Sequence, residues 1–401
     1  MPQAEVNIGL VGHVDHGKTT LTKALSGVWT DKHSEEIRRG ISIRLGYADC
    51  SFYKCEKCQG PEAYTSQDKC KCGGKAKFLR TVSFVDSPGH ETLIATMLSG
   101  SALMDGVILV IAADEKCPQP QTKEHLLALK LMGLKNIIVV QNKVDVVDKE
   151  AAKQNKKDIE EFLKRVGIEA PIIPIAANYN ANTDVLLAAI QEFIPTPKRD
   201  LTKASKMYIA RSFDINRPGA DIKGIKGGVL GGSLIQGELK KGDEIEIKPG
   251  IKKVRHNQNV WETVKTKIAE IDAGEETVDS ARPGGLIALQ TYLDPNLTKS
   301  DALSGNVLGK VGTVPEPLSS VDSKVTLIER QLIDSDVKIM PNEPLMLSIG
   351  TTVTVGMVQK HAGDQLSMTL KIPIVAVKGD KFAISKRIDM KWRLIGYGEI
   401  L

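Results

Sequence analysis

The segment GHVDHGKTT, residues 12–20, constrains the fold of this chain more than any other stretch. It follows the apolar run VNIGLV (6–11), which indicates a buried strand, and it leads into TLTKALSG (20–27), whose leucines lie four residues apart on one helical face. A strand, a glycine-bounded loop and a helix are the context that a phosphate-binding loop needs. Gly12 and Gly17 would let backbone amides close around a triphosphate, while the helix start adds positive dipole density beneath it. The segment therefore predicts a nucleotide-binding α/β domain.

Side chains of the same loop are candidate contacts to phosphates and metal. Lys18 is expected to reach the outer phosphates, and the Thr19 hydroxyl is expected to complete a Mg²⁺ coordination shell. The predicted nucleotide-binding residues of the loop are Asp15, His16, Gly17, Lys18, Thr19 and Thr20. An ordinary glycine-rich loop is the alternative, but every specified motif position is filled in the right context, which argues against it.

Length and composition indicate a globular protein of several domains. At roughly 100 to 200 residues per domain, a chain of 401 residues corresponds to a few domains, and we expect three. Hydrophobic residues make up 41% and charged residues 26%, as in globular rather than disordered chains. The net charge of +5 is compatible with a polyanionic partner without demonstrating one. Neither a secretion signal nor an apolar run of ~18 residues is present, so we expect a cytoplasmic protein.

Residues 29–49 are charged and turn-rich, and we expect a mobile loop there. Within it, RGISI (39–43) resembles the first switch of translational GTPases, in which a hydroxyl residue after the glycine binds Mg²⁺ in the triphosphate state. Here that residue is Ser42, where threonine is common in the family. Serine keeps the oxygen ligand but lacks the methyl group that stiffens the side chain. A solvated charged loop is the alternative interpretation.

Four of the six cysteines lie close together in the sequence, which suggests a metal site before disulfides in a reducing compartment. The predicted zinc ligands are Cys55, Cys58, Cys70 and Cys72, a CxxC pair followed by a CxC pair. Four thiolates held by two tight turns can surround a tetrahedral Zn²⁺. Because the second pair is one residue tighter than usual, a distorted or three-thiolate site remains an alternative. Cys50 and Cys117 are isolated and are expected to be buried structural thiols.

A second nucleotide contact is predicted at DSPGH (86–90), which ends a branched, strand-like run. Asp86 can hold Mg²⁺ through water, and the Gly89 amide can meet a γ-phosphate. Although DxxG alone is common, its distance after the phosphate-binding loop makes a chance match improbable. His90 is the candidate catalytic residue, because it could orient the attacking water; a surface histidine is the alternative.

The base-recognition motif follows in NIIVVQNKVD, where a strand leads into Asn142, Lys143 and Asp145. Asp145 can accept the N1–H and N2–H of guanine, whereas adenine offers neither donor, so the motif predicts GTP rather than ATP. The stretch PIIPIAAN (171–178) supplies the remaining candidate contacts, which are Ala176, Ala177 and Asn178. GTPases often carry a Ser-Ala pair here; the alanine pair keeps a backbone contact to the base but loses a hydroxyl brace.

From Met207 onward, short branched runs alternate with turns rich in Gly, Pro and Asp, without a convincing long helix. This texture predicts β-barrels. Two prolines near residues 314–322 mark a second boundary. We therefore expect a mostly parallel α/β P-loop GTPase domain at 1–200 with a zinc-ribbon insertion at 50–80, then β-barrel domains at 201–318 and 319–401.

The phosphate-binding loop, RGISI, DSPGH, NKVD and two trailing barrels occur in the order found in translational GTPases, the group of elongation factor Tu, which the chain resembles over essentially its whole length. The cysteine insertion narrows the resemblance, because elongation factors lack it. The chain resembles the gamma-subunit family of archaeal and eukaryotic initiation factor two, also in SGSALMDGVILVIAADEKCPQPQTKEH, IPTPKRD, RSFDINRPG and GGVLGGSLIQG.

The resemblance implies the core of a heterotrimer whose GTP-bound form carries initiator methionyl-tRNA to the small ribosomal subunit. Alpha and beta subunits would dock on the second domain and the GTPase domain, and the tRNA acceptor end would lie between that domain and the barrels. By the same likeness, Asp15 and Gly40 would hold a second Mg²⁺ beside the ion on Thr19 and Ser42. Hydrolysis would be slow without a stimulating partner, since no arginine finger is identifiable in cis.

Three alternatives stay open at this level. A selenocysteine-specific elongation factor also delivers tRNA, but the zinc insertion and the chain end soon after the third domain count against it. A regulatory GTPase subunit of a sulfate-activating enzyme shares the domains, but the cysteine cluster has no obvious place there. A scaffold that never cycles would make the complete nucleotide motifs superfluous.

Overall fold

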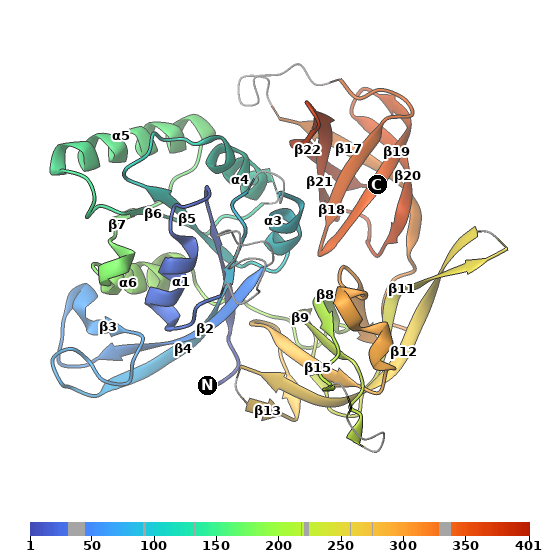
Figure 1. Ribbon diagram of the computed structural model, residues 1–401, viewed down its shortest axis with the longest axis horizontal. Coiled ribbons are helices and arrows are strands. Elements are labelled where there is room, and N and C mark those ends of the chain that lie inside the picture. The colour runs from blue at the N-terminus through green and yellow to red at the C-terminus, as the bar shows by residue number, and fades with distance from the viewer. Residues whose placement is uncertain are drawn as a thin grey trace. The chain divides into compact units, whose positions relative to one another are not determined.

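The computed structural model describes residues 1–30, 45–90, 94–131, 133–217, 219, 224–256, 258–274, 276–328 and 338–401 (Figure 1). The chain forms two compact units, Gln3–Pro197 and Lys198–Leu401. The first is an α/β unit and the second contains both β-barrels, so the predicted fold class is confirmed. The domain boundaries at residues 200 and 318 stay predictions.

The first unit is built on a seven-stranded sheet in the order β3-β2-β4-β1-β5-β6-β7. Its strands are β1 (Val6–Val11), β2 (Gly46–Cys55), β3 (Tyr64–Thr65), β4 (Ala76–Asp86), β5 (Gly106–Ala112), β6 (Ile137–Asn142) and β7 (Ile172–Pro174). The five strands from β4 to β7 in this order are parallel, while β2 pairs antiparallel with β4 and β3. Since β1, β5 and β6 are buried along their whole length, they need the near-continuous apolar sequences that they have.

Helices cover both faces of this sheet (Figure 1). They are α1 (Lys18–Ser26), α3 (Ile94–Ser101), α4 (Pro120–Leu131), α5 (Lys149–Val166) and α6 (Thr183–Phe193), with short 3-10 turns η1 (Gly60–Ala63) and η3 (Ala177–Tyr179). One buried cluster joins Leu21 and Leu25 of α1 and Leu186 of α6 to the strands. Because parallel strands end at the same edge, the loops after β1, β4, β6 and β7 gather at one edge of the sheet.

The first barrel of the second unit is a ring in the order β11-β16-β8-β9-β15-β12, closed by pairing of β11 with β12 and extended by β13. Its elements are β8 (Lys206–Phe213), β9 (Val229–Gln236), β10 (Leu239–Lys240), β11 (Glu244–Arg255), β12 (Gln258–Ala273), β13 (Glu276–Val278), β14 (Ser280–Ala281), β15 (Ile287–Thr291), η5 (Pro295–Leu297), η6 (Lys299–Asp301) and β16 (Val307–Lys310). Alternating residues such as Met207 and Ile209 of β8 fill its core.

The second barrel is closed in the order β17-β20-β19-β18-β21-β22. Its strands are β17 (Leu318–Leu327), β18 (Pro344–Ile349), β19 (Thr352–Ala362), β20 (Gln365–Ile374), β21 (Lys381–Ile388) and β22 (Lys391–Ile400). Leu345, Leu347 and Phe382 are among the side chains of its buried core. Nowhere in the ranges described above does a helix reach the length and apolarity that crossing a membrane requires.

Candidate functional site

The phosphate-binding loop lies between β1 and α1 and is shaped by two glycines. Gly12 has φ +146°, and a Cβ there would lie 2.3 Å from the Val110 carbonyl oxygen. Gly17 has φ +88°, and a Cβ there would lie 2.3 Å from Asn142 Nδ2. Any side chain at either position would therefore collide with β5 or with the base-recognition motif. The loop keeps the bare backbone surface that phosphate oxygens need.

Lys18, Thr19, Asp86 and Gly89 come together at the phosphate side of the loop. Lys18 Nζ donates a hydrogen bond to the His13 carbonyl oxygen at 2.6 Å, and Thr19 Oγ1 donates to Asp86 Oδ2 at 2.7 Å. A Cβ on Gly89 would lie 2.5 Å from Lys18 Nζ. The arrangement brings one lysine cation beside two hard oxygen donors, a hydroxyl and a carboxylate, which is the donor chemistry that Mg²⁺ prefers. The residues present fit a nucleotide with Mg²⁺.

Sequence reasoning missed one group at this end of the site, the hydroxyl of Thr30. Its Oγ1 donates a hydrogen bond to Asp86 Oδ2 at 2.7 Å, the same oxygen that accepts from Thr19. Thr30 follows the end of α1 in a stretch without a recognisable motif, so the local sequence does not predict a role for this residue. The role is evident only from its contact with Asp86 in the folded structure.

Asn142 connects the phosphate side of the site to the predicted base side. Its Nδ2 donates to the His16 carbonyl oxygen at 2.9 Å, and its Oδ1 accepts from the Ala177 amide at 3.2 Å. Lys143 has φ +61° and its Nζ lies 3.3 Å from Asp114 Oδ2. Asp145 is exposed. The end of β6 thus brings these motif residues next to the loop that carries Ala177.

The remaining predicted residues differ in how they face the site. Ala176 and Ala177 are buried, Asn178 is exposed, and Thr20 lies in the first turn of α1. Asp15 adopts a left-handed backbone conformation at φ +61°. The His16 ring is buried, donates from Nδ1 to the Val110 carbonyl oxygen at 2.9 Å, and has Nε2 3.3 Å from Glu115 Oε2. Burial lowers the pKa of His16, and the contacts of its two ring nitrogens with Val110 and Glu115 leave its backbone available to a nucleotide.

Ser42 and Gly40 lie outside the described residues. His90 is half-buried directly after Gly89, at the end of the described segment 45–90. Its predicted role in orienting water stays a prediction.

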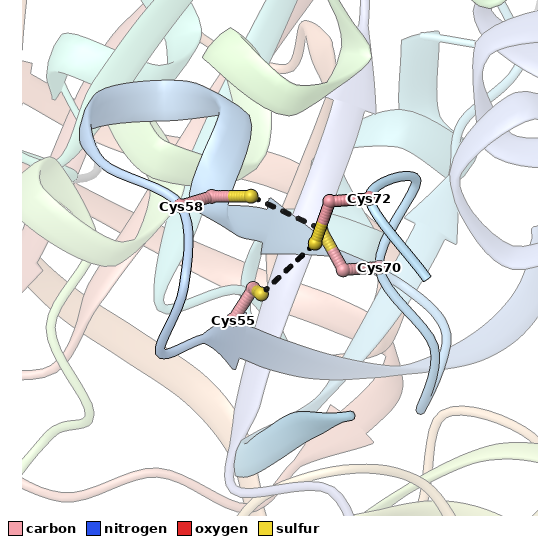
Figure 2. Close-up of side chains that lie close together, drawn as sticks. All are labelled: Cys55, Cys58, Cys70 and Cys72. Carbon is pink, nitrogen blue, oxygen red and sulfur yellow. Dashed lines mark hydrogen bonds between the residues drawn. The ribbon is translucent and has the colours of Figure 1, made fainter. Parts of the chain in front are cut away.

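The four clustered cysteines meet at the far end of β2 and β4 (Figure 2). Their Sγ atoms all lie within 4.8 Å of one another, with 3.6 Å between Cys55 and Cys72 and between Cys58 and Cys70. Thiolates at ~2.3 Å from a tetrahedral Zn²⁺ would be about 3.8 Å apart, so the separations fit that ion. All four are free cysteines.

The tight CxC turn positions the second pair of thiols, Cys70 and Cys72, next to the first. The Cys70 amide donates to the Gly74 carbonyl oxygen at 2.9 Å, and the Gly73 amide, at φ +78°, donates to the Cys70 carbonyl oxygen at 2.8 Å. A hydrogen bond from the Gly74 backbone, followed by neighbouring thiols, lowers the pKa of Cys72 to about 7. Hydrogen bonds with Cys72 and Cys70 raise the pKa of Cys58 to about 12, so the thiols share protons among themselves, and binding a metal would release those protons.

Comparisons with known proteins agree with this geometry. The elongation factor Tu GTP binding domain family matches residues 3–196, and the family of the initiation factor eIF2 gamma C terminus matches residues 319–400. Translation initiation factor 2 subunit gamma of Methanococcus maripaludis is 58% identical over 405 residues, which cover 100% of this chain and 99% of the relative. The chain belongs to the translation initiation factor 2 gamma-subunit family.

Other gamma subunits of this family are similar over their whole length. That of Methanocaldococcus jannaschii is 58% identical, over 99% of this chain and 98% of the relative, and that of Archaeoglobus fulgidus is 54% identical, over 100% and 95%. The family is one of translational GTPases, so the chain is a GTPase and a GTP-dependent translation initiation factor subunit, with GTP or GDP and Mg²⁺ as its ligands.

Two solved structures of elongation factors share the fold. A bacterial selenocysteine-specific elongation factor EF-Sec aligns with a TM-score of 0.77 at 24% identity, covering 99% of this chain and 58% of that chain. Elongation factor SelB of Methanococcus maripaludis, in complex with the GTP analogue GppNHp, aligns with a TM-score of 0.74 at 22% identity, covering 100% and 79%. At these identities the likeness concerns the fold alone, and the elongation-factor alternative is not favoured over the gamma-subunit family.

Proposed function

We propose that this gamma-type subunit binds initiator methionyl-tRNA in its GTP-bound form and delivers it to the small ribosomal subunit. The observation that carries the proposal is a single hydrogen-bonded site, in which Asn142 joins the predicted phosphate-binding residues to the predicted base-binding residues. The chain that contains this site matches initiation-factor gamma subunits over its whole length. A site of this kind can make the protein's conformation depend on the γ-phosphate.

Within this site, the roles follow from chemistry and position. Lys18 would neutralise the outer phosphates, the loop amides around Gly17 would bind their oxygens, and the Gly89 amide would sense the γ-phosphate. Thr19 and Asp86 would hold Mg²⁺, which supplies charge neutralisation at the phosphates, with Asp86 acting through water. Ser42 would complete that shell, and Asp15 with Gly40 would hold the second ion implied by the family.

Base selection would fall to Asn142, Lys143 and Asp145, with Ala176, Ala177 and Asn178 lining the other side. His90 would orient the attacking water. The catalytic assignment fails if His90→Ala hydrolyses GTP at the wild-type rate under stimulated conditions.

We further propose a heterotrimer with alpha and beta subunits, which would dock on the first barrel domain and on the GTPase domain, and a cytoplasmic location with the ribosome. The cysteine cluster would bind one Zn²⁺ and so stabilise an insertion whose own apolar cluster contains little besides the cysteines and Ala76. Boundaries near residues 200 and 318 would separate the GTPase domain from the two barrels.

The experiment that tests the proposed function compares three RNAs on the heterotrimer with a non-hydrolysable GTP analogue. These are charged initiator tRNA, charged elongator tRNA and uncharged initiator tRNA. We expect the first to bind most tightly, because delivery at initiation requires selection of both the tRNA and its methionyl group. Equal affinity for the two charged tRNAs would exclude initiator-specific delivery.

A further inference from the structure

The Oδ2 atom of Asp86 accepts two hydroxyl hydrogen bonds, and the second comes from outside every recognised motif. Thr19 Oγ1 and Thr30 Oγ1 each lie 2.7 Å from this oxygen. The Asp86 side chain is buried, so these two donors contribute to its orientation. The terminal torsion of an aspartate is intrinsically broad, and one donor alone leaves the carboxylate more freedom than two.

Gly46 makes the approach of Thr30 to Asp86 sterically feasible. It is the first residue of β2 and lies directly opposite Asp86 in the antiparallel register of β2 and β4. A Cβ on Gly46 would lie 2.6 Å from Thr30 Cβ and 3.2 Å from Thr30 Oγ1. Such a contact is too short, so a larger residue at position 46 would displace the threonine from the carboxylate.

Thr30 and Gly46 stand at the two ends of one chain segment, and both meet Asp86. The sequence between them carries Gly40 and Ser42, two of the predicted Mg²⁺ ligands. The carboxylate at the end of β4 is therefore held by the phosphate-binding helix through Thr19 and by the base of this segment through Thr30.

We propose that Thr30 is a positioning residue for Mg²⁺-dependent nucleotide binding, with Gly46 as the residue that gives it access to Asp86. The inference rests on the proposed nucleotide and Mg²⁺ site. Thr30 acts through Asp86: its proton helps to hold the carboxylate in the orientation in which Oδ2 also accepts from Thr19, and in which Asp86 would hold Mg²⁺ through water. Outer-shell partners of this kind commonly contribute about 10- to 100-fold to metal affinity.

The test measures binding of a fluorescent GDP analogue to the full chain across a Mg²⁺ titration, and again in excess EDTA. Thr30→Val keeps the shape of the side chain and removes the donor; we expect it to raise the Mg²⁺ concentration at half-maximal tightening by about tenfold. Thr30→Ser should restore the wild-type value. Gly46→Ala should reproduce the Thr30→Val defect by steric displacement, and the double variant should add little to either single change, because both break one contact.

Thr22→Val is the matched control, because it is the same substitution in α1 at a hydroxyl that bonds the Lys18 carbonyl oxygen instead of a carboxylate. It should leave the Mg²⁺ midpoint unchanged, and thermal unfolding confirms that each variant is folded. A wild-type midpoint in Thr30→Val overturns the inference, as does an equal loss of affinity with Mg²⁺ and with EDTA, which identifies a merely structural contact. If wild-type protein binds the analogue no more tightly with Mg²⁺, the proposed Mg²⁺ site is wrong, and if it does not bind the analogue at all, the proposed nucleotide site is wrong.

Discussion

Asp145 is exposed just after β6. Asn142, three residues earlier, is buried and forms hydrogen bonds with both neighbouring loops. The two residues of one motif therefore have separate tasks. Asn142 holds the walls of the site together, and Asp145 keeps a carboxylate at the surface that the base would reach. This division allows base preference to be changed without dismantling the site.

We expect Asp145→Asn to lose its preference for GTP and to bind xanthosine triphosphate instead. A carboxylate accepts two N–H groups of guanine, whereas an amide can donate to the oxygen that xanthine carries at position 2. The shift in relative affinity should be on the order of 100-fold, measured by competition binding. Asp148→Asn, at an exposed carboxylate that caps α5 through the Ala151 amide, is the control. A variant that still favours GTP contradicts the assignment.

A second prediction concerns the histidine buried in α4. His125 is buried, and its Nδ1 has no hydrogen-bond partner within the described residues. Burial, followed by the charges of Lys18, His13 and His16, lowers its pKa to about 3 from 6.5. Because the unfolded chain takes up the proton first, the associated stability is fully present above pH 6.5 and is lost as the pH falls toward 3.

Replacing His125 with leucine removes this titration. Between pH 7.5 and pH 5, the wild-type free energy of unfolding should fall by about 2 kcal/mol more than that of His125→Leu. The reason is that His125 binds a proton in the unfolded chain in this pH range but not in the folded protein. Chemical unfolding at the two pH values measures the difference. His361→Leu, at a half-buried position of β19, is the matched substitution against which His125→Leu is compared. Parallel curves for wild type and His125→Leu would show that another group controls the acid sensitivity.

At the scale of elements, the end of α6 depends on a side chain from β4. The buried Arg80 guanidinium donates to the carbonyl oxygens of Ile190 at 3.0 Å and Ile194 at 2.8 Å, and to Thr196 Oγ1 at 3.1 Å. Ile190 lies in the last turn of α6, where its carbonyl oxygen also accepts from the Ile194 amide, and Ile194 is the residue directly after the helix. This end of a helix attracts cations. The strand that ends in Asp86 thus also anchors the last helix of its unit.

Arg80→Met should lower the free energy of unfolding by about 3 kcal/mol, because it leaves buried carbonyl oxygens without a charged donor. Guanidinium-induced unfolding followed by circular dichroism measures the change. Arg165→Met, at an exposed arginine in the last turn of α5, should cost much less. Equal small effects of the two substitutions would mean that water replaces the guanidinium at α6.

The cysteine insertion gives a prediction about metal removal. Purified protein should contain close to one equivalent of zinc, and Cys72→Ser should lose most of it because only three thiolates remain. Cys117→Ser, at a thiol outside the cluster, should retain the metal. Elemental analysis gives the stoichiometry. Far less than one equivalent in wild-type protein, prepared without chelators, would contradict the four-thiolate site.

Some features of the site and the fold can be predicted from local sequence motifs, and others cannot. The phosphate-binding loop, the strand ends at Asp86 and Asn142, and the paired cysteines are local patterns, because neighbouring residues carry out one task together. Thr30 and Arg80 act on partners 56 and 110 positions away, and neither has a local pattern. The barrels were predictable as a class from their turns, but strand order depends on nonlocal pairing, such as that of β11 with β12, which closes the ring.

At the scale of the whole molecule, the proposed function requires that the affinity for tRNA depend on which nucleotide the first unit has bound. Calorimetry of the heterotrimer with initiator methionyl-tRNA should show at least about tenfold tighter binding with a non-hydrolysable GTP analogue than with GDP, a coupling of about 1.4 kcal/mol. Binding of uncharged tRNA under the same conditions sets the background. Equal affinities in the two nucleotide states would mean that GTP does not control tRNA binding.

The side chain of Asn142 has a consequence for how a bound nucleotide leaves. One amide group bonds the phosphate-binding loop through the His16 carbonyl and the base-side loop through the Ala177 amide. A displacement of either loop would therefore strain a hydrogen bond of the same planar amide group. We expect a bound nucleotide to leave in one concerted event, in which the contacts to the base and to the phosphates loosen in the same step.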